Sequence, residues 1–160
     1  AIRFAAMAVQ PIVPLFVAAL APGAAYPASR AGVVLGVLGV TSALSAVVLG
    51  RVGDRRGHRA ILVACVAAAG LLYLPMALAG GPWQLAALQA AFGFAAGGMI
   101  PAANALVADL TPASRRATMY GITSSSAALG AFIGPLAGAA LAVAVGFRAT
   151  FLAVGVLLLV

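Results

Sequence analysis

Charged side chains are scarce in this sequence. Only 7% of its 160 residues are charged, whereas 65% are hydrophobic and the mean hydropathy is +1.19. Lysine and glutamate are absent: all nine basic residues are arginines, and the acids are Asp54 and Asp109. An average soluble domain carries roughly 25% charged residues. This composition excludes an ordinary soluble domain and leaves lipid as the solvent in which most of the chain could stay exposed.

The residues that carry most enzyme chemistry are also few. Cys65 is the single cysteine, so the sequence offers neither an internal disulfide nor a cysteine metal cluster, and we expect a small packing residue there. The sequence contains no nucleophile–base pair, phosphate-binding loop or set of metal ligands. We therefore expect no enzyme activity, no cofactor and no metal site.

The net charge of +7 could indicate a nucleic-acid partner, because basic surfaces neutralise phosphates. The arginines, however, stand at the ends of apolar runs, where the positive-inside rule places them in membrane proteins. We therefore expect a lipid bilayer, and not nucleic acid, as the partner of these charges.

Long apolar runs repeat along the whole chain, separated by short segments rich in glycine, proline or arginine. About 20 apolar residues are enough for a helix to span a bilayer. The runs predict six transmembrane helices, at about residues 1–20, 32–50, 60–79, 83–108, 117–145 and 147–160. The predicted fold is an all-α membrane protein, a six-transmembrane-helix bundle.

Arginine is distributed unevenly between the two sides of this predicted bundle. The polar loops at 51–59 and 109–116 carry six arginines, and the opposite side carries Arg30 and Arg148. Because cytoplasmic loops are enriched in arginine, both polar loops are predicted to be cytoplasmic. We expect a multi-pass integral membrane protein, with the bacterial inner membrane as the predicted location.

The segment that follows the second run has a distinctive arrangement of residues. It reads Gly50-Arg51-Val52-Gly53-Asp54-Arg55-Arg56-Gly57-His58-Arg59-Ala60-Ile61-Leu62. Its composition alone fits an ordinary arginine-rich loop. Its spacing resembles the signature loop between helices two and three of the major facilitator superfamily. The matching positions are Gly50, Val52, Asp54, Arg55, Gly57, Arg59 and Leu62, and His58 stands where a basic residue is usual.

This resemblance implies that Asp54 takes part in a charge network at the cytoplasmic face, with Asp109 as the second acid. Such a network holds the two halves of the transporter together when the transporter is open outward. The local chemistry suits this role, because a carboxylate near helix ends accepts charge-assisted hydrogen bonds. The resemblance extends the gating assignment to Gly50, Arg55, Gly57 and Arg59.

The predicted fifth helix contains Gly130, Gly134, Pro135 and Gly138. One interpretation is a packing face of small residues, kinked at the proline, that lets helix backbones approach closely in lipid. The arrangement also resembles the fifth-helix signature of antiporters in the same superfamily, with Ala139 in place of a final glycine. Members with that signature are mostly exporters, especially drug:proton antiporters. The resemblance therefore implies efflux and a conformational role for these residues.

The predicted fourth helix and its following loop resemble those of small multidrug exporters in the superfamily. Matching residues are Phe92, Gly93, Gly97, Gly98, Pro101, Asn104, Asp109, Pro112, Arg115 and Gly121. That group often carries an arginine, linked to proton coupling, at the position of Gln89. Proton-driven transport also usually needs an ionisable group at membrane depth, whereas both aspartates lie at helix ends. The proton is one candidate coupling ion, and its binding residue is left open.

Four polar residues are candidates for the substrate path: Arg3, Gln10, Gln89 and Asn104. By span length alone Arg3 anchors the cytoplasmic end of the first helix. By family resemblance it lies deeper, where an arginine is a functional candidate. The three amides lie on helices one and four, which the resemblance implies line the central cavity. Each amide could instead bond a neighbouring helix, for about 1 kcal/mol.

Residues 1–160 are therefore interpreted as the N-terminal half of a twelve-helix facilitator, built from two inverted three-helix repeats and cut at both ends. The predicted function is secondary active transport of a small, hydrophobic or amphipathic compound by alternating access, as a drug efflux antiporter. The missing C-terminal six-helix half is the expected partner. Two alternatives remain: an importer or uniporter of a small metabolite, and a non-transporting scaffold or half-size channel.

Overall fold

The computed structural model describes residues 2–20 and 27–159, and these residues are almost entirely helical. Within these ranges lie seven α-helices and one short 3-10 helix. Their bounds are α1 Ile2–Val9, α2 Ile12–Leu20, α3 Pro27–Arg56, α4 His58–Ala77, α5 Pro82–Leu110, η1 Ala113–Arg115, α6 Arg116–Val145 and α7 Phe147–Leu159. The described ranges contain no strand, which confirms the predicted all-α fold.

Two helices, α1 and α2, replace the single helix predicted at residues 1–20. The helix is interrupted at Gln10 and Pro11, which form a turn. Proline lacks a backbone N–H and its ring collides with the carbonyl four residues earlier, so Pro11 does not continue α1. Pro14 falls in the first turn of α2, where a missing N–H costs little. The break leaves the Gln10 side chain exposed at the end of α1.

The structure corrects the predicted loop at 51–59. Helix α3 begins at Pro27 and continues to Arg56, well beyond the predicted span 32–50. Gly57 alone separates α3 from α4, with a φ of 92°. Glycine adopts this positive φ because it has no Cβ, so the chain turns within one residue. The arginine-rich segment therefore consists of two helix ends and a single-residue turn.

The second predicted loop, 109–116, is closer to the structure. Helix α5 ends at Leu110, two residues beyond the predicted span. The short helix η1 and the first residue of α6 complete the connection. This connection is therefore a short, partly helical link rather than an open loop.

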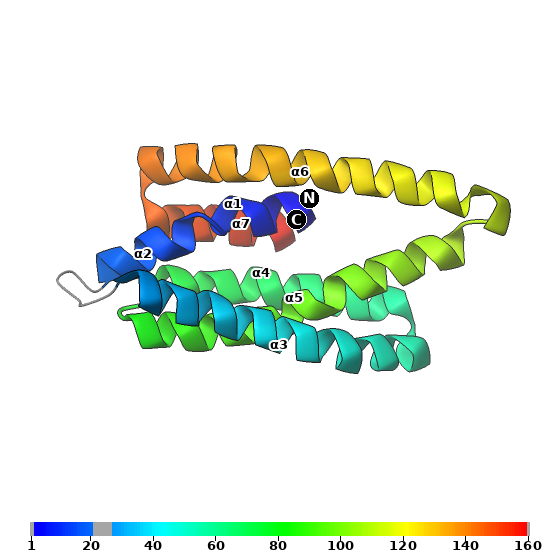
Figure 1. Ribbon diagram of the computed structural model, residues 1–160, viewed down its shortest axis with the longest axis horizontal. Helices are drawn as coiled ribbons and strands as arrows, with labels where there is room; N and C mark the ends of the chain where they lie inside the picture. The colour runs from blue at the N-terminus through cyan, green and yellow to red at the C-terminus, as the bar shows by residue number, and fades with distance from the viewer. Residues whose placement is uncertain (1, 21–26, 160) are drawn as a thin grey trace.

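Three prolines lie inside helices without ending them. Helices α4, α5 and α6 continue through Pro75, Pro101 and Pro135. In Figure 1 the second half of α5 leaves α3 and runs toward the start of α6. Pro101 lies in that half, where it removes one hydrogen bond from the helix and allows a bend.

The helices pair in a pattern with internal two-fold symmetry (Figure 1). Helix α1 packs against α6, and α5 packs against α3, so the first helix of each three-helix unit contacts the second helix of the other. The third helices, α4 and α7, pack against each other. Two inverted three-helix repeats are expected to pair in this way. The first unit comprises residues 2–20 and 27–77, and the second comprises residues 82–159.

Glycines permit close approach at all three helix pairs. A Cβ on Gly134 would lie 2.8 Å from a backbone oxygen of α1, and a Cβ on Gly93 would lie 2.6 Å from a backbone oxygen of α3. At the α4–α7 pair, Gly70 and Gly155 face each other, and a Cβ on either would lie 3.2 Å or 3.0 Å from the other's carbonyl oxygen. Small residues at such positions allow the dispersion contacts that hold helices together in lipid.

Four helices, α3 to α6, are long and apolar enough to cross a membrane. Two shorter apolar segments, Phe4–Ala19 and Phe147–Leu159, complete the six predicted helices. Large hydrophobic side chains are exposed along α3 and α6, among them Val40, Leu44, Val47, Leu129, Phe132 and Leu136. Continuous apolar exposure of this kind suits contact with lipid or with another apolar surface. The chain is an integral, multi-pass membrane protein.

Candidate functional site

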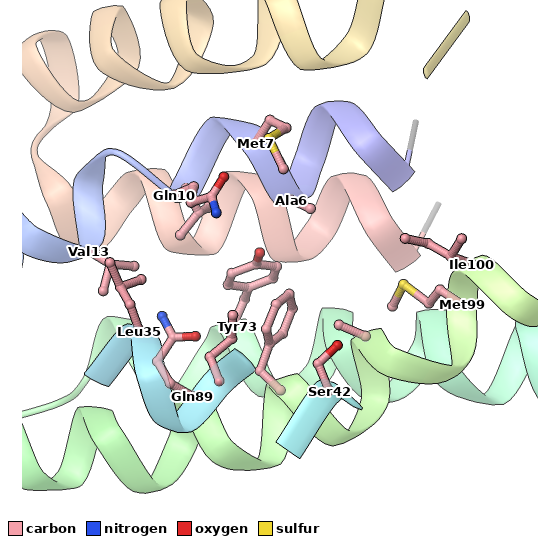
Figure 2. Close-up of a pocket in the computed structure, with 14 residues that line it drawn as sticks. Ala6, Met7, Gln10, Val13, Leu35, Ser42, Tyr73, Gln89, Met99 and Ile100 are labelled. Carbon is pink, nitrogen blue, oxygen red and sulfur yellow. The ribbon is translucent and has the colours of Figure 1, made fainter. Parts of the chain in front are cut away.

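A cavity of about 260 Å³ is lined by residues of α1, α2, α3, α4 and α5. Fourteen residues line it, and the polar ones are Gln10, Ser42, Tyr73 and Gln89 (Figure 2). The remaining walls are aliphatic, aromatic or methionine side chains. An apolar pocket with a few placed polar groups is the usual composition of a small-molecule site.

Gln89 is a deeply buried polar group of this cavity. The residue is 3% exposed, and it lines the cavity. A hydrogen bond between this amide and a ligand in the cavity would contribute about 0.5–1.5 kcal/mol to binding. The amide offers both donors and an acceptor, which suits a neutral polar group on such a ligand.

Tyr73, on α4, forms another part of the cavity wall and contacts neighbouring aromatic rings. Its ring centroid lies 4.9 Å from that of Phe92 and 6.2 Å from that of Phe151. Phe16 continues the series, 5.4 Å from Phe151. Tilted aromatic pairs at these distances are favourable and fix the ring. In Figure 2 the Tyr73 hydroxyl points toward the side of the cavity on which Gln10 lies.

A second cavity, of about 270 Å³, lies between α5 and α6. Asn104, Thr123 and Ser124 are its polar lining residues. Met99 and Ile100 line both cavities, so the two adjoin along α5.

The predicted substrate-path residues are thus divided between these cavities. Gln10 and Gln89 share the first, and Asn104 lies in the second, where its backbone carbonyl accepts a hydrogen bond of 2.9 Å from the Tyr120 hydroxyl. Arg3 belongs to α1, but its side chain lies outside the described part of the structure. A transport role for these four residues stays a prediction.

A second candidate site lies at the polar ends of α3, α4 and α5. His58 is the first residue of α4, and its ring contacts two carboxylates. Its Nδ1 lies 3.0 Å from Oδ2 of Asp109, and its Nε2 lies 3.2 Å from Oδ1 of Asp54. The His58 side chain is 19% exposed, against 73% for Asp54 and 60% for Asp109. The ring therefore fills the space between the helix ends while both carboxylates reach solvent.

The local sequence explains how the ring is positioned. The turn at Gly57 brings His58 back over the last turn of α3, where Asp54 lies. Gly53 is buried beneath the ring, and a Cβ there would lie 3.0 Å from Cδ2 of His58. Glycine at this position therefore leaves room for the imidazole. The apolar part of α4 begins at Ala60, so the cluster lies outside the apolar span.

Electrostatics in this cluster favour the charged histidine. The hydrogen bond to Asp109, followed by the one to Asp54, raises the pKa of His58 above its ordinary value. The structure thus brings the two predicted acids of the gating network to one shared histidine. Asp54 and Asp109 are joined through His58 rather than directly.

The predicted gating set also includes Arg55, Arg59 and Gly50, which are not partners of His58 in the described part of the chain. Arg55 and Arg59 are exposed, and neither pairs with a carboxylate among the described residues. Gly50 has open space where a Cβ would project, so no contact described here requires a glycine. Their gating roles stay predictions.

The predicted residues of the fifth span lie along the α1–α6 pair. Gly134 and Gly138 are buried against backbone atoms of α1. Gly130 and Pro135 are half-buried. These positions support the packing interpretation, while the conformational role implied by the resemblance stays a prediction.

Several residues of these sites are not predicted from the sequence, among them Ser42, His58 and Tyr73. In the sequence His58 stands only as a departure from the usual basic residue, because its contact with Asp54 is made across the turn at Gly57 and not within one helix. Tyr73 lies inside an apolar run, and nothing adjacent to it in sequence marks it as part of a cavity wall.

Comparison with known proteins matches the whole chain, residues 1–160, to the family model described as Major Facilitator Superfamily. Among curated relatives, Multidrug resistance protein MdtG from Salmonella arizonae, from Salmonella paratyphi B and from Salmonella newport are each 35% identical over 150 residues. The matches cover 94% of this chain and 37% of each relative, so the chain spans little more than a third of their length. Two paired three-helix units and a family match over every residue lead to one assignment: the chain belongs to the Major Facilitator Superfamily.

Proposed function

We propose that residues 1–160 form the N-terminal half of a secondary transporter that exports small hydrophobic or amphipathic compounds. The cavity lined by residues of α1 to α5 carries this proposal, because it combines apolar walls with the buried amide of Gln89. An amphipathic compound would bury apolar surface there and pair its polar group with the amide. Similarity to proteins named for multidrug resistance supports export as the direction.

The transport cycle follows from the repeat architecture. A C-terminal six-helix half would complete the substrate site, and rocking of the two halves would expose that site to each side of the membrane in turn. Close backbone contacts at Gly93, Gly134 and Gly155 support movement of this half as a unit, since they leave little room for its helices to slide.

The proposed location is the bacterial inner membrane, with the helix ends that carry Asp54 and Asp109 in the cytoplasm. The excess of arginine at those ends supports this orientation. In the proposed cycle, the cluster around His58 stabilises the closed cytoplasmic side. The proton is the proposed coupling ion.

Flux measurements test this proposal directly. The full-length protein that contains these residues would be reconstituted in vesicles, and the movement of a fluorescent lipophilic compound followed with and without a pH gradient. We expect extrusion that depends on the gradient. Uptake in the opposite direction would favour an importer. No flux of any tested compound by correctly inserted protein would favour a non-transporting scaffold or channel.

A matched pair of variants tests the cavity itself. Gln89→Leu removes the buried amide at similar volume, and we expect the apparent affinity for substrate to fall about threefold to tenfold, the value of one hydrogen bond. Gln84→Leu makes the same change at an exposed position of α5 outside the cavity and should leave transport near wild type. Equal effects of the two substitutions would contradict the assignment of this cavity to substrate.

A further inference from the structure

The two contacts of His58 impose a condition on its protonation state. Both ring nitrogens lie within hydrogen-bond distance of a carboxylate oxygen, at 3.0 Å and 3.2 Å. An ionised carboxylate only accepts hydrogen bonds, and a neutral imidazole has a single N–H to donate. Both contacts are therefore satisfied together only when the ring is protonated at both nitrogens.

The positions of the two carboxylates strengthen this requirement. Asp54 lies in the last turn of α3, and Asp109 is the next-to-last residue of α5. The C-terminal end of a helix carries partial negative charge, which disfavours a nearby carboxylate by about 0.3–1 kcal/mol. The C-terminal ends of α3 and α5 meet here, each with a carboxylate, so a cation between them offsets the unfavourable concentration of negative charge.

Other charged groups near this end of the bundle do not fill that role. Arg55, Arg56 and Arg59 are exposed, and none is a partner of His58 or of either aspartate among the described residues. The side chain of Arg116 donates to the Thr111 carbonyl at 3.2 Å. Within the described chain, His58 faces Asp54 from α3 and Asp109 from α5.

We infer that Asp54, His58 and Asp109 form a proton-binding site that joins the ends of α3 and α5 when it is occupied and releases one of them when it is empty. The proton enters from solvent, which reaches both carboxylates, and it resides on the imidazole. Gly53 supplies the space for the ring, and Gly57 supplies the turn that places it. The site depends only on the geometry of this chain and not on the identity of any substrate.

The direction of the pH effect follows from the carboxylate contacts. They raise the pKa of His58 in the folded protein above its ordinary value of about 6.5. The link therefore contributes stability that is fully present below about pH 6.5 and is lost as the pH rises through the raised value. Acidification strengthens this closure of the helix ends, and alkalinisation loosens it.

Nuclear magnetic resonance of histidine tests the site without any transport assay. The full-length protein would be labelled at histidine in lipid nanodiscs, and the His58 signals identified by their loss in His58→Gln. We expect His58 to titrate above pH 6.5, and to titrate at lower pH in Asp54→Asn and in Asp109→Asn. A pKa at or below 6.5 would overturn the inference. So would a pKa that responds to one aspartate and ignores the other.

A transport measurement then tests the consequence of the site, and this step rests on the proposed function. Substrate exchange would be followed with equal pH on both sides of the membrane, so that no gradient contributes. We expect the wild-type rate to change about fivefold across the His58 titration, and the rate of His58→Arg to change less than about twofold, since arginine stays charged. A His58→Arg profile identical to the wild-type profile would overturn the inference. Absence of exchange in every variant would count against the proposed transport function, while the resonance result would still decide the proton site.

Discussion

The turn at Gly57, between α3 and α4, and the turn at Gly146, between α6 and α7, have similar φ angles and the same hydrogen-bond pattern. Their φ angles are 92° and 86°. Each glycine N–H donates to the carbonyl four residues earlier, at 2.8 Å and 3.0 Å, and each glycine carbonyl accepts from the N–H four residues later, at 3.4 Å and 3.2 Å. Both are followed by one variable residue and then Arg-Ala. The turn is therefore repeated in both three-helix units.

The side chains around the two turns differ. After Gly57 comes His58, which bridges two carboxylates, whereas Phe147 at the equivalent place lies 6.0 Å, ring to ring, from Phe16. The position of Asp54, three residues before the first turn, is matched by Val143 before the second. The backbone of the turn thus serves the fold in both units, and the residue after glycine determines whether that end of the bundle carries charge or packs apolar surface.

Replacement of the turn glycines should produce the largest effect. Gly57→Ala and Gly146→Ala force a Cβ into a conformation that is nearly restricted to glycine, at a cost of about 1–3 kcal/mol each. We expect both to lower the unfolding midpoint of the purified full-length protein by similar amounts. Gly39→Ala, in open space on α3, is the control and should not be destabilising. Loss of stability in only one turn variant would break the equivalence of the two turns.

Replacement of Phe147, the residue that follows the second turn glycine, should have the next largest effect on stability. Phe147→His places a polar ring in the aromatic cluster of α2 and α7, where lost aromatic contact costs about 0.5–1.5 kcal/mol before any burial of the polar ring. Phe147→Leu is the apolar control and should be less destabilising. The thermal unfolding midpoints of the two variants measure the difference. Equal unfolding midpoints for Phe147→His and Phe147→Leu would contradict an apolar packing role for Phe147.

Gly53→Ala should change stability little but alter the first turn specifically. A Cβ at 3.0 Å from the His58 ring obliges the ring to shift, while alanine itself favours the helix by about 1 kcal/mol relative to glycine. We therefore expect the histidine titration to move toward its ordinary value without a matching loss of stability. The resonance titration of His58 measures this, and an unchanged titration would show that Gly53 does not set the ring position.

Added salt should produce the smallest change, and it should act only on the histidine contacts beside the turn at Gly57. Because the two carboxylates are largely exposed, added salt screens their attraction for the imidazolium. The pKa of His58 should fall slightly between about 0.1 M and 1 M salt, because the screening length shortens from about 10 Å to about 3 Å. A pKa that rises with salt would contradict an attractive contact with the aspartates.

The sequence predicted the approximate place of the apolar segments because apolar runs are direct evidence of membrane-spanning length. It failed at residues 51–56, since arginine marks the edge of the apolar layer but is itself a good helix former. It also missed the break at Pro11. A single proline within a membrane helix is tolerated, as at Pro75 and Pro101, whereas Pro11 is followed by Pro14 within one turn.

The sites were predictable only in part, because cavities form between segments far apart in sequence. Gln10 and Gln89 were chosen as polar residues in apolar helices, and they do line one cavity. Tyr73 reaches the same cavity only through the packing of α4 against α5, which no local pattern reveals. The link through His58 depends on the positive φ of Gly57 and on the space at Gly53, and both are properties of the folded backbone.

The single-residue turns also have a mechanical consequence. One residue extends at most about 3.6 Å, so Gly57 and Gly146 each hold the two helix ends that they connect close together. The end of α3 cannot separate from the start of α4, nor can the end of α6 separate from the start of α7. Any motion within these helix pairs must be a pivot about the tethered end or a flexing of the helices themselves, and α4 and α6 each contain an internal proline where flexing is easiest.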